Sequence, residues 1–210
     1  MKSISRIAVA IALASLAGLT GAQDKAAWVN LLEGKDLTKN FTTKGNWTLG
    51  DDGVVALVPR KGESGWQRYD AYLWAKKQYK DFECEFEYKV EKSGNSGFYF
   101  HVGDLSEPVK KGIEVQIYDQ AKDAKLSDHT TGGIIPGIPP TKNAAKGAGE
   151  WNKMFVSVKG NRVVVTVNDV VVNDVPLDSK SIKDRPATGY IGFQDHGLPM
   201  WLRNIKIREL

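Results

Sequence analysis

The chain has 210 residues and a formal net charge of +4, with 29 Lys and Arg against 25 Asp and Glu. Basic residues are interspersed with acidic ones and form no block, which argues against a nucleic-acid partner. One cysteine excludes an intramolecular disulfide, so a hydrophobic core has to hold the fold.

The N-terminus has the features of a secretory signal peptide. Lys2 and Arg6 precede an apolar run over residues 7–19, and small residues follow up to Ala22. A retained membrane anchor is the competing interpretation, but an anchor needs about 20 apolar residues. We therefore predict a signal peptide over residues 1–22 and an exported protein, periplasmic or extracellular. Loss of Lys2 and Arg6 leaves 27 basic and 25 acidic side chains, a net charge of +2, and no membrane anchor.

The remaining residues, 23–210, fit one domain and have the pattern of a β-sheet protein. In residues 81–90 apolar side chains, Cys84 among them, alternate strictly with Glu and Lys, which predicts a strand with one buried and one solvated face. Asn168 and Asp169 separate two Val-rich runs and predict a tight hairpin turn. Further strands are predicted at 54–58, 72–75, 97–102, 112–118, 154–158, 162–167, 170–173, 189–193 and 201–207. The fold class is thus all-β, a two-sheet antiparallel β-sandwich or jelly roll, with no amphipathic helix after residue 22.

Residues 131–150 differ from the rest of the chain. They are rich in Gly and Pro and have little periodicity. Long irregular loops in compact domains are usually functional or disordered. We expect this loop to flank a cleft, with a mobile surface excursion as the alternative.

Three predicted strands carry uncharged polar and aromatic residues on the face turned away from the core. Alternation places Phe98, Phe100 and Val102 inward. The outward side chains of the three strands are then Tyr99, His101, Glu114, Gln116, Tyr118, Tyr190 and Gln194. Amides, a carboxylate, an imidazole and phenols suit sugars, whose hydroxyls need donors and acceptors and whose rings pack on aromatics. An ordinary solvated sheet face is the alternative.

A second polar cluster follows the strand at 189–193. Asp195 and His196 could supply a base and its orienting partner, or could simply form a turn that ends at Gly197. Trp66 lies in a loop-like context and is the tryptophan we single out as a ligand platform. The three histidines show no zinc-binding spacing, and the chain has no phosphate loop and no nucleophile elbow. We predict no metal and no cofactor.

Several motifs occur in an order that resembles a known family. They are Leu31 to Leu37, Asn95 to Phe98, Gly112 to Asp119, Thr131 to Gly133, Glu150 to Asn152, and Gly192 to Gly197 with Arg203 to Ile205. Together they look like the 3-keto-disaccharide hydrolase family, whose domain resembles the concanavalin A-like lectin and glucanase jelly roll. One departure is His101, where the strand in this family often ends in Arg.

The resemblance implies hydrolysis of glycosides whose sugar carries a ketone at carbon 3. Such a ketone acidifies the hydrogen on carbon 2, so a base could start an elimination that water addition completes. As a hypothesis, Glu114 or His196 is the base, Asp195 orients His196 or acts as acid, and Arg203 stabilises negative charge. The expected substrate-binding residues are Asn95, Tyr99, His101, Gln116, Tyr118, Asp119, Gln194 and Trp66.

Two other functions remain open at this stage. The first is a glycan-binding module of the same fold without turnover. The second is a conventional glycosidase, although laminarinase-type strands carry Glu-x-Asp-x-x-Glu and here Gln116 stands at the middle acid. The expected partner is a carbohydrate. A functional link to a sugar 3-oxidoreductase is implied by the resemblance alone.

Overall fold

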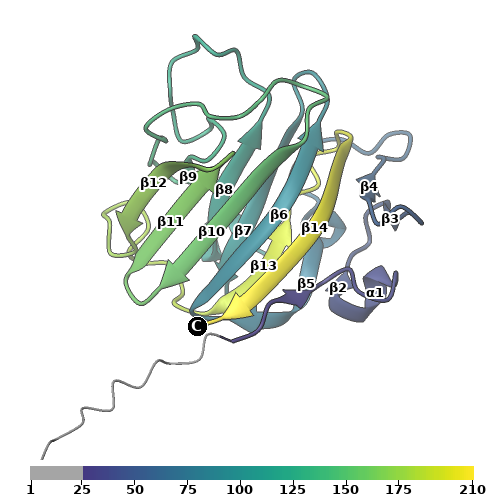
Figure 1. The fold of residues 1–210 in the computed structure, drawn as a ribbon, viewed down its shortest axis with the longest axis horizontal. Coiled ribbons are helices and arrows are strands. Elements are labelled where there is room, and N and C mark those ends of the chain that lie inside the picture. The colour runs from purple at the N-terminus through teal and green to yellow at the C-terminus, as the bar shows by residue number, and fades with distance from the viewer. Residues whose placement is uncertain (1–25) are drawn as a thin grey trace, which may run out of the picture.

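The computed structural model describes residues 26–210, which form two packed antiparallel sheets (Figure 1). The predicted signal peptide, residues 1–22, lies outside the described residues. The larger sheet runs in the order β12 (Val170–Pro176), β11 (Arg162–Val167), β10 (Asn152–Lys159), β6 (Phe82–Val90), β14 (Met200–Glu209), β4 (Val55–Leu57) and β3 (Trp47–Leu49), and β1 (Val29–Asn30) also pairs with β14.

The smaller sheet lies behind the larger one in Figure 1. Its order is β2 (Phe41–Thr42), β5 (Leu73–Tyr79), β13 (Gly189–Phe193), β7 (Asn95–Val102), β8 (Ile113–Tyr118) and β9 (Ile134–Ile135). The helices of the described chain are short: α1 (Leu37–Asn40), α2 (Pro108–Lys111) and a 3-10 turn at Tyr69–Ala71. None of the helices within residues 26–210 has the length and apolar character to cross a membrane.

The predicted all-β sandwich is confirmed, and each predicted strand is present with bounds that differ by a few residues at most. Asn168 and Asp169 both have positive φ, 48° and 62°, as a tight two-residue hairpin requires. The strands that the sequence did not reveal are β1, β2, β3 and β9, which have two or three residues each. Segments this short show no periodicity.

Aromatic side chains from both sheets meet in the core. Phe86 on β6 lies 5.2 Å from Phe98 on β7 and 4.9 Å from Phe193 on β13, between ring centroids. Cys84 on β6 is fully buried, and burial raises the pKa of its thiol, so the thiol stays protonated. The sulfur therefore serves as core packing, as the alternation predicted.

The solvated face of β6 is a ladder of cross-strand ion pairs. Glu87 accepts two hydrogen bonds from the Arg203 guanidinium on β14, at 2.6 and 3.0 Å. Glu85 pairs with Lys153 at 2.7 Å, and Glu83 pairs with Arg208. The acidic residues of the alternating segment thus have structural partners in neighbouring strands.

Strand β7 departs from strict alternation at its end. Opposite β13, Tyr190 pairs with Val102 and Gly192 with Tyr99, so two residues of β7 face one of β13. His101 has a φ of 52° in this bulge. The bulge turns Val102 to the same face as Tyr99. Sequence alternation had predicted that Val102 points into the core, and this prediction is wrong.

The outer face of the smaller sheet has its own apolar layer. Tyr72, Trp74, Tyr99 and Val102 form a buried cluster there, separate from the main core. Leu105 and Val109, which follow β7, pack against it. This covered face carries the candidate site.

Candidate active site

A cavity of about 160 Å³ opens on the outer face of β7, β8 and β13. The strands and the segments beside them supply its polar walls. The lining residues are Trp66, Asn95, Tyr99, Val109, Glu114, Gln116, His129, Ile135, Gln194 and His196.

Glu114 is the one carboxylic acid among these lining residues, and it is only 6% exposed. Burial raises the pKa of its carboxyl to about 7, although a hydrogen bond from Tyr99 favours the charged form. The Tyr99 phenol donates this bond to Oε2 at 2.6 Å. A carboxyl that titrates near neutral pH can accept and return a proton during one reaction cycle.

Gly97 on β7 provides the space in which the Glu114 carboxyl lies. A Cβ atom at Gly97 would come within 2.0 Å of Glu114 Oε1 and within 2.7 Å of its Cγ and Cδ. The strand register explains the approach, because Gly97 pairs with Gln116 while Tyr99 pairs with Glu114. Glycine at this position is therefore a requirement of the site's geometry.

His129 lines the same cavity from a loop and is held by its neighbour Asp128. Asp128 Oδ1 lies 2.8 Å from His129 Nδ1, and Asp128 Oδ2 accepts a hydrogen bond from the Gly137 amide at 2.7 Å. Burial works against the charge on Asp128, but the bonds from Gly137 and His129 outweigh it and lower the pKa of this carboxyl. With Nδ1 engaged, Nε2 of His129 is the nitrogen available for chemistry.

His196 and three amides complete the polar walls. Burial lowers the pKa of His196, so its imidazole is neutral at pH 7 and offers one donor and one acceptor. Gln116 donates to Asn95 Oδ1 at 2.8 Å, which fixes both amides. Gln194 is buried, and its Oε1 has no hydrogen-bond partner within residues 26–210. A buried acceptor of this kind is suited to a ligand hydroxyl.

Comparison with known proteins places the chain in a family. The model of the 3-keto-alpha-glucoside-1,2-lyase-like domain matches residues 27–208. The chain belongs to this family. The resemblance to 3-keto-disaccharide hydrolases noted from the sequence is thereby confirmed.

Relatives agree with this family and with the fold. A curated 3-keto-disaccharide hydrolase of Bacteroides thetaiotaomicron is 29% identical over 208 residues, which cover 78% of this chain and 70% of the relative. The crystal structure of a candidate glycosyl hydrolase from Parabacteroides distasonis has a TM-score of 0.74 at 24% identity and covers 88% of this chain and 100% of that one. A β-glucanase of Bacillus licheniformis has a TM-score of 0.51 at 12% identity, with 90% and 99% covered. At these identities the two structures show the jelly-roll fold alone.

The structure of this family member brings many of the predicted site residues together. The predicted residues that line the cavity are Trp66, Asn95, Tyr99, Glu114, Gln116, Gln194 and His196. The expectation that the loop at 131–150 flanks a cleft is confirmed at Ile135.

Two residues predicted to be catalytic lie elsewhere. Arg203 is in the larger sheet, where it binds Glu87 and lies 4.1 Å from the centroid of the Trp151 ring. Asp195 is fully buried and does not line the cavity, and its Oδ1 accepts bonds from Arg68 and from the Gly197 amide, both at 2.7 Å. Asp195 Oδ2 is buried without a partner, and no hydrogen bond joins Asp195 to His196 within residues 26–210, so the predicted orienting contact is not formed there.

Three residues predicted to bind substrate are also absent from the cavity lining. His101 points away because of the bulge in β7, and its Nε2 lies 2.7 Å from the Lys80 carbonyl. Asp119 accepts a hydrogen bond from the Ser93 amide and shapes a turn. Tyr118 ends β8 and contacts Thr131 through its backbone.

Sequence reasoning missed His129, because it lies in a segment without periodicity. The available signal was the Asp128-His129 dipeptide, which has the same composition as Asp195-His196. Within the part of the chain that the structure describes, no group of three or more His, Cys, Asp or Glu side chains could hold a metal ion.

Proposed function

We propose that this protein hydrolyses the glycosidic bond of 3-keto-disaccharides and related 3-keto-glycosides. The observation that carries the proposal is Glu114, a buried carboxyl with a pKa of about 7 beside two histidines and three amides. Membership of the 3-keto-alpha-glucoside-1,2-lyase-like family and likeness to a 3-keto-disaccharide hydrolase support the choice of substrate.

The reaction begins at carbon 2, where the neighbouring ketone makes the hydrogen acidic. A base takes this proton, and the electron pair forms an enolate with the ketone. The ketone then re-forms as the C1=C2 double bond forms and the C1–O bond breaks, while the leaving oxygen takes a proton. Water adds its oxygen to C1 and gives one proton to the acid, while the base returns its proton to C2, so one water is consumed overall and both catalytic groups regain their starting forms.

Glu114 is the base in this proposal. Its raised pKa leaves a useful fraction of carboxylate at neutral pH, and Tyr99 holds one oxygen in place. His129, oriented by Asp128 through Nδ1, must carry a second proton on Nε2, and it gives this proton to the leaving oxygen. Neutral His196 and the amides bind the ketone oxygen and the hydroxyls, where N–H donors stabilise the enolate.

A conventional glycosidase mechanism has less support. Such enzymes place two carboxyl groups on either side of the scissile bond. Among the described residues that line the cavity, Glu114 is the one carboxyl group. Asp128 is engaged by His129 and by the Gly137 amide.

The decisive experiment compares a disaccharide with its 3-keto derivative, using wild type and Glu114→Gln. We expect wild type to cleave only the keto form, and Glu114→Gln to lose turnover by on the order of 10²-fold or more while it still binds sugar. Equal cleavage of both sugars would sink the keto-specific mechanism. Sugar binding without any turnover by wild type would favour a glycan-binding module.

A second experiment assigns His129. If His129 protonates the leaving oxygen, His129→Gln should slow a 3-keto-disaccharide far more than a 3-keto-glucoside of 4-nitrophenol, whose leaving group needs no proton. His196→Gln is the matched control and should slow both substrates equally. If His129→Gln and His196→Gln slow the two substrates in the same ratio, His129 is not the group that protonates the leaving oxygen.

We also propose that the protein is exported. The proposal is supported by the basic and apolar N-terminal sequence, which lies outside the described residues. N-terminal sequencing of the protein purified from its native cells tests it. A mature chain that starts near residue 23 is expected, and a chain that starts at Met1 would contradict it.

A further inference from the structure

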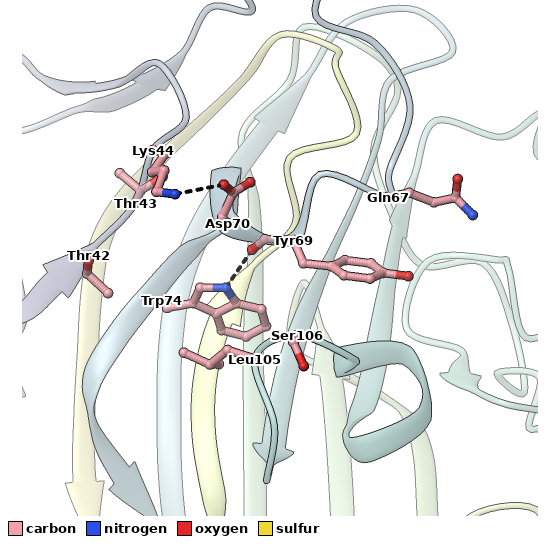
Figure 2. Close-up of a pocket in the computed structure, with 9 residues that line it drawn as sticks. All are labelled: Thr42, Thr43, Lys44, Gln67, Tyr69, Asp70, Trp74, Leu105 and Ser106. Atoms are coloured by element: carbon pink, nitrogen blue, oxygen red, sulfur yellow. Dashed lines mark hydrogen bonds and ion pairs between the residues drawn. The ribbon is translucent and has the colours of Figure 1, made fainter.

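A second, larger hollow has a volume of about 530 Å³, and Figure 2 shows the residues that line it. Three segments line it: the end of β2 and the turn after it, the stretch from Gln67 to Trp74, and the turn after β7. The lining residues are Thr42, Thr43, Lys44, Gln67, Tyr69, Asp70, Trp74, Leu105 and Ser106. None of them lines the Glu114 cavity, so the proposed function leaves this hollow unexplained.

The base of the hollow is apolar and rigid. Figure 2 shows the Trp74 indole next to the Tyr69 backbone, with Leu105 beneath Trp74. The Trp74 indole donates to the Tyr69 carbonyl at 2.8 Å, and its ring stacks on Tyr72 at 5.4 Å. Trp74 is only 2% exposed, so the surface left for a ligand is the half-buried Tyr69 ring and Leu105. Tyr69 also packs on Tyr72 at 5.9 Å, and these contacts fix its ring before any ligand arrives, which limits the entropy lost on binding.

The rim of the hollow is polar but carries balanced charge. Lys44 and Asp70 form an ion pair at 3.2 Å, which Figure 2 also marks. Gln67 contributes an amide, and Thr42, Thr43 and Ser106 contribute hydroxyl groups. Aromatic surface below and mixed donors and acceptors above favour an uncharged, hydroxyl-rich ring over a phosphate or a carboxylate.

The hollow and the Glu114 cavity share a wall. Trp66 lines the cavity, Tyr69 lines the hollow, and their ring centroids are 6.1 Å apart. Val109 of the cavity and Leu105 of the hollow pack against one buried cluster around Tyr99. The two openings are therefore neighbours on either side of the Trp66 and Tyr69 rings.

We propose that this hollow is a second sugar subsite, which binds the unoxidised ring on the leaving-group side of a 3-keto-disaccharide. The proposal rests on the proposed function for the identity of the ring held at Glu114. The hollow then explains how a disaccharide is distinguished from a glycoside with a small leaving group.

The test uses two variants of the full mature chain, Tyr69→Ala, which removes part of the platform, and Ser106→Trp, which fills the hollow. Both should lower kcat/KM for a 3-keto-disaccharide by about tenfold, the loss of one ring–aromatic contact, and leave methyl 3-keto-glucoside unchanged. Thr48→Trp, at an exposed position of β3 in the larger sheet, is the matched control and should change neither substrate. Equal effects on both substrates, or no effect on either, would overturn the subsite.

A binding measurement separates this proposal from the proposed function. Glu114→Gln is titrated with the unoxidised disaccharide by calorimetry, with and without Ser106→Trp. Loss of binding in the double variant supports the subsite, whether or not wild type turns over the keto sugars. Absence of turnover by wild type would reject only the proposed reaction. Undiminished binding in the double variant would reject the subsite, whatever the turnover.

Discussion

The Tyr99 phenol on β7 donates a hydrogen bond of 2.6 Å to the Glu114 carboxyl on the neighbouring strand β8. Both groups are buried, and the bond favours the charged form of Glu114 against the burial that raises its pKa to about 7. The same carboxyl is confined on its other side by the backbone of Gly97. Two adjacent strands thus set both the position and the proton affinity of the candidate base.

Removing this phenol should move the pH dependence of the reaction. In Tyr99→Phe the carboxylate loses its donor, so the pKa of Glu114 rises further and the acidic limb of kcat/KM shifts to higher pH. The measurement is a kcat/KM profile from about pH 5 to about pH 9. Tyr118→Phe, on the same strand as Glu114 but outside the cavity, is the control. An unchanged limb in Tyr99→Phe would show that another group is the base.

Adding one methyl group at Gly97 should disable the site. The new Cβ would meet Glu114 Oε1 at 2.0 Å, so the carboxyl has to leave its position. We expect kcat/KM to fall by about 100-fold, as displacements of about 1 Å do at catalytic groups. Gly147→Ala is matched to it, because a Cβ there meets nothing within 4 Å. Wild-type activity in Gly97→Ala would mean that the carboxyl position is unimportant.

Asp195 should act on substrate affinity and not on proton transfer. Asp195 binds Arg68, which lies two residues after the cavity residue Trp66 in the chain. Burial raises the pKa of the Asp195 carboxyl, although the Gly197 amide and Arg68 oppose this shift. Asp195→Asn weakens the contact with Arg68, so KM should rise while kcat stays within about twofold. Steady-state kinetics on a 3-keto-disaccharide measure both. A hundredfold loss of kcat alone would restore the catalytic role that the sequence suggested.

The sequence predicted the strand faces well because their periodicity is local. Glu114 and Gln116 face the cavity, while Ile113 and Val115 lie in the core, as alternation requires. His101 was placed wrongly because a bulge adds one residue to β7, and nothing in the local pattern marks it.

The sequence pattern could not predict which residues from distant parts of the chain meet in the folded protein. Arg203 follows His196 closely in the chain, but β14 crosses to the other sheet and carries Arg203 to Glu87. The two Asp-His dipeptides show the same limit. Asp128 binds His129, whereas Asp195 turns to Arg68, and only the folded backbone decides between these outcomes.

The last prediction concerns stability. Folding raises the pKa of Glu114 from an ordinary 4.5 to about 7, so between these values the native protein holds a proton that the unfolded chain has released. The contribution of Glu114 to the free energy of unfolding is therefore fully present below about pH 4.5 and is lost as the pH rises through about 7, at about 1.4 kcal/mol for each unit of pKa. Relative to Glu114→Gln, wild type should lose stability over this range. Denaturant unfolding of both proteins across the range measures the difference.

Glu87→Gln is the control with the opposite sign. Burial opposes the charge on Glu87, but hydrogen bonds from Arg203 and Asn204 outweigh it and lower its pKa. Glu87 therefore stabilises the fold above its unfolded pKa, and this contribution is lost as the pH falls through the lowered value. As the pH rises, the free energy of unfolding of wild type should increase relative to that of Glu87→Gln. Over the same rise it should decrease relative to that of Glu114→Gln. Parallel curves for wild type and Glu114→Gln would show that Glu114 has an ordinary pKa, which would remove the physical basis of its role as base.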